Sequence, residues 1–244
     1  GLALSLPMPL LLRGVPKNNN YFPADGRLPK EDILELLRSV YAESSEDELL
    51  EMMNHIKKRK TEQMMGGHSG YNKRKNPNLA KQAALSLSKP NGPRVAVFEV
   101  NGFDTHAAQG GVDGTHTKCL VEMDNIIQNL KENLKEAYKD TIILTVTEFG
   151  RTIKQNGGNG TEHGYGTAIF MAGGLLKKSQ VHTDWPGLKR KEMYEGRDLN
   201  ATIDARSVYA SAMATVFDLD FKRIQKDVFW GEDLQNLSDK LFKA

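Results

Sequence analysis

The sequence has little cysteine, no long hydrophobic run and no excess of charge of either sign. A single cysteine, Cys119, among 244 residues excludes an internal disulfide framework. The 33 basic and 31 acidic residues leave a net charge of +2, so no overall field attracts nucleic acid or an anionic membrane. The apolar stretch 1–14 is interrupted by Pro7 and Pro9 and is too short to cross a bilayer. We therefore expect no membrane span and no nucleic-acid partner.

Several signatures of catalysis and nucleotide binding are also missing. The chain contains no Ser-His-Asp motif, no Gly-x-Ser-x-Gly elbow, no P-loop and no dinucleotide fingerprint. The stretch GGNG at 157–160 opens no clear helix, so it is a poor match to a phosphate-cradling loop. The basic runs at 57–60 and 72–75 are short, and a solvated helix face explains the first better than a nucleic-acid contact does.

Hydrophobic periodicity predicts helices in the first third of the chain and alternating strands and helices after it. Helices are expected over 29–42, 44–65, 78–89, 115–140 and 203–218, and strands over 94–100, 141–147 and 167–174. A strand, a long helix and a second strand in succession predict a parallel crossover. Because the strands are almost continuously apolar, helices should cover both faces of the sheet. The predicted fold class is α/β, an α/β/α sandwich with a mostly parallel sheet.

The same pattern suggests how the chain is divided. We expect an N-terminal segment with a helical excursion over residues 1–90 and an α/β core over residues 91–244. The two parts would pack together as one domain that is truncated at the N-terminus.

Polar side chains follow the predicted strands and occupy the loop that enters the third one. They are Asn101, Asp104, His106, Glu148, Arg151, Glu162 and His163. Functional groups gather at the carboxyl ends of strands in open α/β sheets, so these side chains should converge on one rim. Carboxylates and imidazoles are ligands for zinc and manganese. The predicted metal ligands are Asp104, His106, Glu148 and His163.

Each part of this set also has an ordinary structural explanation. Residues 104–106 could form a capped turn, Glu148 and Arg151 an ion pair, and residues 161–163 a cap at a helix entry. Cys119 lies beside an apolar stripe with no base near it in sequence, which favours an inert thiol over a nucleophile. The metal hypothesis therefore depends on whether the fold brings these segments together.

Six motifs in fixed order give a more specific indication. GFDTHAAQ, TEFGRT, NGGNGTEHGYG, AGG, DWPGL and GRDL, over roughly residues 76–220, resemble domain-of-unknown-function family 1501 of the alkaline-phosphatase-like superfamily. The resemblance implies an α/β/α core and two divalent metals. It also implies hydrolysis or transfer of phosphate or sulfate esters through a serine or threonine nucleophile.

The resemblance also implies roles for particular residues. Asp104, His106 and His163 would hold one metal ion, although the spacing of Asp104 and His106 is narrower than in the better-known enzymes. Glu148 stands at the strand end that helps to hold the second metal, and its neighbour Phe149 cannot be a ligand.

Two further residues would support the chemistry of such a site. Arg151 would neutralise an anionic phosphate or sulfate group with its bidentate fork. Glu162 would orient His163. The hydroxyls of Thr105 and Thr147 lie nearby in sequence, but we expect neither to be the nucleophile, because packing decides where a β-branched side chain at a strand end points.

The expected function is that of a metal-dependent hydrolase of phosphate or sulfate esters, using zinc or manganese. The alternative is a non-catalytic binding or assembly protein on a phosphatase-like scaffold with a degenerate second metal site, which Phe149 favours. The resemblance also implies a longer, exported or periplasmic protein, and a complementing N-terminal half or an oligomer is a possible partner. The nucleophile would be either a water or a hydroxyl from the absent N-terminal half.

Overall fold

The structure is a computed structural model that describes residues 2–4, 19–21, 35–36, 39 and 76–243. Its helices are α3 (Asn76–Leu87), α4 (Thr115–Leu134), the 3-10 helix η2 (Lys135–Asp140), α5 (Ala205–Phe217), α6 (Phe221–Asp227) and α7 (Ser238–Leu241). Its strands are β1 (Leu2–Leu4), β2 (Asn19–Tyr21), β3 (Ala96–Phe98), β4 (Ile143–Leu144), β5 (Gly150–Arg151), β6 (His163–Gly164) and β7 (Met171–Ala172).

Part of the predicted N-terminal helical region falls outside this description. Residues 35, 36 and 39 are helical, but the rest of the predicted helices 29–42 and 44–65 lies outside the described residues. Within the part of the chain that the structure describes, no helix is both long and apolar enough to cross a membrane.

The described part of the chain is mixed α/β, with short strands in three small sheets. β1 lies between β2 and β3 and is parallel to both. β4 pairs with β7 and β5 pairs with β6, and both pairs are antiparallel. The predicted parallel crossover from β3 to β4 is wrong, because these two strands belong to different sheets.

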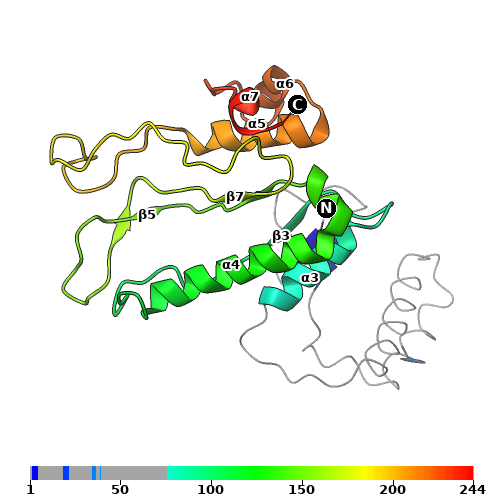
Figure 1. The fold of residues 1–244 in the computed structure, drawn as a ribbon, viewed down its shortest axis with the longest axis horizontal. Coiled ribbons are helices and arrows are strands. Elements are labelled where there is room, and N and C mark those ends of the chain that lie inside the picture. The colour runs from blue at the N-terminus through cyan, green and yellow to red at the C-terminus, as the bar shows by residue number, and fades with distance from the viewer. Residues whose placement is uncertain (1, 5–18, 22–34, 37–38, 40–75, 244) are drawn as a thin grey trace.

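The antiparallel pairs follow from one long hairpin that runs from β4 to β7 (Figure 1). Towards its tip, the Thr152 N–H donates to the Glu162 carbonyl at 3.0 Å, and the Asn156 N–H donates to the Gly160 carbonyl at 2.8 Å. The predicted glycine-rich loop is therefore the outer half of this hairpin. Because the chain returns beside itself, β7 runs antiparallel to β4.

Helices lie on both sides of the base of the hairpin, as Figure 1 shows for α3 and α4 on one side and α5–α7 on the other. One hydrophobic core contains Leu134 of α4, and Ile143 of β4 packs against it. A second core contains Phe242, and Ile142 and Leu144 pack against that one. Neighbouring residues of a strand face opposite sides, so β4 joins both cores and anchors the hairpin.

The long helix α4 buries one face along its length. Its buried residues are Cys119, Ile126, Leu130 and Leu134. The neighbouring apolar residues Leu120 and Ile127 are only partly buried. Burial raises the pKa of the Cys119 thiol, which keeps it protonated and unreactive.

Helix α5 begins at a charged N-cap, Asp204. The Asp204 carboxylate accepts a hydrogen bond from the Arg206 N–H at 2.8 Å and pairs with the Arg206 guanidinium at 2.7 Å. We expect Asp204→Ala to lower the free energy of unfolding by about 1 kcal/mol, the usual value of an N-cap, in chemical denaturation. The exposed Asp184 forms no hydrogen bond or ion pair with a described residue, so Asp184→Ala should change it by less than about 0.5 kcal/mol.

The pH dependence of this contribution has a definite sign. The hydrogen bond from Arg206 lowers the pKa of Asp204 in the folded state. The stabilisation is therefore complete above the ordinary aspartate pKa and is lost as the pH falls below it. Equal stability of Asp204→Ala and wild type at neutral pH would contradict the cap.

Candidate metal centre

The segment that follows β3 lies along the tip of the hairpin. The N–H groups of Ala108 and Gln109 donate to the carbonyls of Gly158 and Asn159, both at 2.9 Å. This backbone pairing places Asp104–His106 beside β6, although more than fifty residues separate the two segments in the chain.

Gly160 lies at the closest approach of the two segments. A methyl group added at this position would overlap the backbone carbonyl group of His106 and would lie 2.5 Å from the carbonyl oxygen of Thr105. Only glycine, which has no side chain, allows the hairpin to approach so closely.

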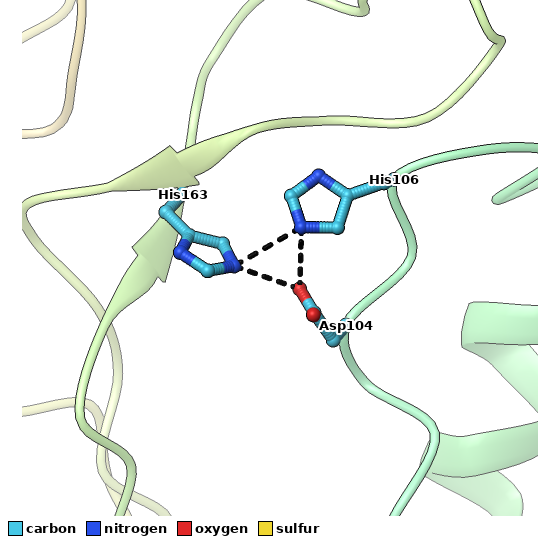
Figure 2. A group of neighbouring side chains, drawn as sticks. All are labelled: Asp104, His106 and His163. Carbon is cyan, nitrogen blue, oxygen red and sulfur yellow. Dashed lines mark hydrogen bonds and ion pairs between the residues drawn. The ribbon is translucent and has the colours of Figure 1, made fainter.

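Three side chains of the predicted ligand set meet at this contact (Figure 2). Nε2 of His106 and Nε2 of His163 lie 3.0 and 2.9 Å from Oδ1 of Asp104, and 3.1 Å from each other. The side chains are between 44% and 54% exposed, so a small molecule can reach them from solvent. We refer to Asp104, His106 and His163 as the triad.

Arg151 of β5 contacts the carboxylate of the triad. Its Nη1 lies 2.5 Å from Oδ1 of Asp104, while its Nε donates to Oγ1 of Thr161 at 2.9 Å and its Nη2 donates to the Thr161 carbonyl. The hydrogen bond from Arg151 is the main reason that the pKa of Asp104 is lowered, with further contributions from the two histidines. Asp104 is therefore an anion at neutral pH.

Glu162 contacts a different histidine from the one expected. Its Oε2 accepts a hydrogen bond from Nδ1 of His106 at 3.1 Å, whereas the sequence interpretation paired it with His163. Its other oxygen, Oε1, lies 2.5 Å from Nδ2 of Asn156. The hydrogen bond from Asn156, followed by that from His106, lowers the pKa of Glu162. Both Glu162 and His163 therefore contact the His106 imidazole, and the expected pair between Glu162 and His163 is replaced by one between Glu162 and His106.

His163 is held by an aromatic ring. Phe149 stacks on it with ring centroids 3.7 Å apart and an angle of 14° between the planes. The fourth predicted ligand, Glu148, does not join the triad. Its side chain is exposed and forms no hydrogen bond or ion pair with any residue that the structure describes.

Comparison with known proteins identifies the sequence family. A family model described as "Protein of unknown function (DUF1501)" matches residues 22–227. The chain belongs to the DUF1501 family. The match confirms the family that the six motifs indicated, and it includes the whole triad. It carries no statement of activity or superfamily. No curated protein and no solved structure matches the chain.

Two residues of this DUF1501 site, Gln109 and Asn156, had no role predicted from the sequence. Gln109 Oε1 accepts hydrogen bonds from the hydroxyls of Thr105 and Thr161, both at 2.8 Å. Asn156 also had no role assigned. The signal for Asn156 was present, because an asparagine before two glycines is typical of a turn in which its side chain accepts a backbone N–H. Nothing local in the sequence marks Gln109.

Proposed function

We propose that this DUF1501 chain is a metal-dependent hydrolase of phosphate or sulfate esters. The proposal rests on the distances between the three side chains of the triad. Around an ion with ligand distances of about 2.1 Å, ligand atoms at right angles are about 3.0 Å apart, and tetrahedral ones about 3.4 Å apart. The separations of 2.9–3.1 Å fit three ligands on one face of an ion, which leaves other positions open to water and substrate.

The donor set suits zinc or manganese and also iron(II), so all three belong in a metal screen. A divalent ion held there would act as a Lewis acid on an ester oxygen and lower the pKa of a bound water. Charge supports an anionic substrate. If the imidazoles are neutral, the charges of Asp104, Glu162 and Arg151 sum to −1. A bound divalent ion would change the net charge of the site to +1.

The chain's own groups suggest how an ester would be bound and attacked. Arg151 is fixed by Thr161 beside the triad, where its guanidinium can pair with phosphate or sulfate oxygens. The hydroxyl of Thr105 donates to Gln109, and that of Thr147 donates to the Phe149 carbonyl at 3.1 Å. Both candidate hydroxyls are therefore engaged, which favours attack by water or by a hydroxyl supplied from outside the described residues.

We also propose that the described elements belong to an alkaline-phosphatase-like α/β/α sandwich. The parallel order β2-β1-β3 and the helices on both sides of β4–β7 support this arrangement. The antiparallel hairpin would then be an extension that carries His163 to the carboxyl end of β3.

The activity is tested with p-nitrophenyl phosphate and p-nitrophenyl sulfate after loading with each metal. We expect turnover of one ester, and we expect Arg151→Lys to lower kcat/KM by about tenfold or more, because lysine lacks the planar fork of arginine. Arg223→Lys, at an exposed ion pair within α6, is the matched control and should leave kcat/KM unchanged. Metal content should be the same in all three proteins.

The exposed Glu148 and the stack of Phe149 on His163 favour the second candidate, a non-catalytic binding protein on the same scaffold. A metal-loaded wild type that turns over neither ester would overturn the hydrolase and leave this binding role. A wild type that binds no divalent metal would overturn the metal centre in both.

A further inference from the structure

Thr161 holds one edge of the Arg151 guanidinium and leaves the rest of it beside the triad. Nε of Arg151 donates to Oγ1 of Thr161 at 2.9 Å, and Nη2 donates to the carbonyl of the same residue. The third nitrogen, Nη1, lies 2.5 Å from Oδ1 of Asp104. These contacts use three of the five N–H groups of an arginine, so one N–H on Nη1 and one on Nη2 remain. The Arg151 side chain is only 18% exposed, so its guanidinium is held by these contacts.

The bond from Arg151 to Thr161 places a requirement on Gln109. An arginine N–H only donates, so Oγ1 of Thr161 accepts from it and must give its own hydrogen to another group. The acceptor is Oε1 of Gln109 at 2.8 Å, which also accepts from the hydroxyl of Thr105 at 2.8 Å. The two threonines are only 6% and 8% exposed. If the amide were reversed, both hydroxyl hydrogens would be buried without an acceptor among the described residues, so the oxygen of Gln109 faces the threonines.

We propose that Gln109 is a positioning residue that fixes the Arg151 guanidinium through the hydroxyl of Thr161, so that the two remaining N–H groups are available to an oxyanion. Gln109 is itself anchored by its backbone. Its N–H donates to the Asn159 carbonyl at 2.9 Å, and its carbonyl accepts from the His116 N–H at 3.2 Å. The use of the two N–H groups for a phosphate or sulfate ester rests on the proposed function. The link from Gln109 to Arg151 requires neither metal nor substrate.

Three substitutions separate this link from ordinary packing. Gln109→Leu keeps the approximate size of the side chain and removes the acceptor. Thr161→Val removes the hydroxyl that bonds to Arg151, whereas Gln109→Glu keeps an oxygen that accepts from both threonines. A link through hydrogen bonds predicts that Glu replaces Gln109 better than Leu does. A packing role predicts the reverse, because a charge at a partly buried position is costly.

Hydrogen exchange of the Arg151 Nε–H, measured by ¹⁵N NMR of the metal-free protein, reads the link directly. Arg151→Lys assigns the signal by removing it. We expect exchange about fivefold faster in Thr161→Val than in wild type, the factor that one hydrogen bond of typical net strength supplies. Gln109→Leu should show a smaller increase, because the Thr161 hydroxyl can then turn away from Nε. Gln109→Glu should exchange as slowly as wild type.

The matched control for exchange is Thr105→Val. It makes the same substitution at a threonine that is also buried and bonds to the same Gln109 oxygen. The Thr105 hydroxyl forms no hydrogen bond with Arg151, so we expect exchange of the Arg151 Nε–H to stay as in wild type. Circular dichroism confirms that each variant folds.

Affinity for an inorganic anion tests the consequence for binding. Calorimetric titration of the zinc-loaded protein with inorganic phosphate and with inorganic sulfate shows which anion wild type binds. We expect this affinity to fall about fivefold in Thr161→Val and by less in Gln109→Leu, with zinc content unchanged. Thr141→Val removes a hydroxyl that donates to the Ala137 carbonyl at 2.7 Å, before β4, and should keep the wild-type affinity. Gln109→Glu is read by exchange alone, because its added charge itself repels an anion.

Exchange in Gln109→Leu as slow as in wild type would overturn the link, and so would exchange in Gln109→Glu faster than in Gln109→Leu. An equal increase in Thr105→Val and Thr161→Val would show a general loosening of the segment in place of a link to Arg151. If exchange follows the expected order but wild type binds no zinc, or binds neither anion, Gln109 still positions Arg151 and the proposed function fails.

Discussion

Asp104→Ala and His163→Ala are each expected to abolish tight binding of divalent metal, with affinity for zinc or manganese at least about 100-fold weaker than in wild type. Each substitution removes one of the three proposed ligand atoms that lie 2.9–3.1 Å apart, and the two that remain would not hold an ion in place. The loss should exceed the effect of removing a partner that only orients a ligand. Metal content by mass spectrometry and titration against a competing chelator measure the effect, with circular dichroism to confirm that the variants fold.

The controls follow from the structure. His182 contacts Gln180 and lies outside the triad, so His182→Ala removes an imidazole without removing a ligand. Glu148→Ala tests the fourth ligand predicted from the sequence. We expect both variants to bind metal as wild type does. A loss of affinity in Glu148→Ala as large as that in His163→Ala would show that Glu148 reaches the ion and that the three-residue centre is incomplete.

Gly160→Ala should both destabilise the protein and weaken the centre. Its methyl group would overlap the backbone carbonyl of His106, and backbone cannot move aside as a flexible side chain can. We expect a loss of about 2–3 kcal/mol in the free energy of unfolding of the metal-free protein, as for overpacked sites. The hairpin tip must shift away from residues 104–106, so metal affinity should fall as well.

Gly157 provides a control three residues away in the same turn. A methyl group at Gly157 would meet no atom within 4 Å, and its φ is not positive. Gly157→Ala should therefore change the free energy of unfolding by less than about 0.5 kcal/mol and leave metal affinity unaltered. Equal thermal stability of the two alanine variants would mean that the hairpin tip does not dock on the segment after β3.

The triad was predictable because its signals are local. Asp104 and His106 directly follow an apolar strand, and His163 lies in a short motif of its own. The general rule that ligands gather beyond strand ends then sufficed to bring them together. Helices α3, α4 and α5 were predictable for a similar reason, since each has an apolar face or a capping residue within its own segment.

The hairpin was not predictable in the same way. Its outer strands are only two residues each, and the six glycines from Gly150 through Gly166 are typical of a loop. Backbone pairing with residues 107–109 holds Gly158 and Asn159 at the tip in place, and that contact is remote in sequence. Register then decides which side chains meet across the two segments. The exchange of His163 for His106 as the partner of Glu162 follows from that register, whereas the stack of Phe149 on His163 follows from the pairing of β5 with β6 inside the hairpin.

Because α4 lies between His106 and His163 in the sequence, the ribosome completes the triad in two separate stages. His106 and His163 are 57 residues apart in the chain. At about 5–20 residues per second, the ribosome adds the second histidine roughly 3–11 s after the first. During that interval the nascent chain offers only Asp104 and His106, an open pair that holds any ion weakly. In the proposed metal centre, an ion would therefore be selected by the finished hairpin, after translation has passed β6.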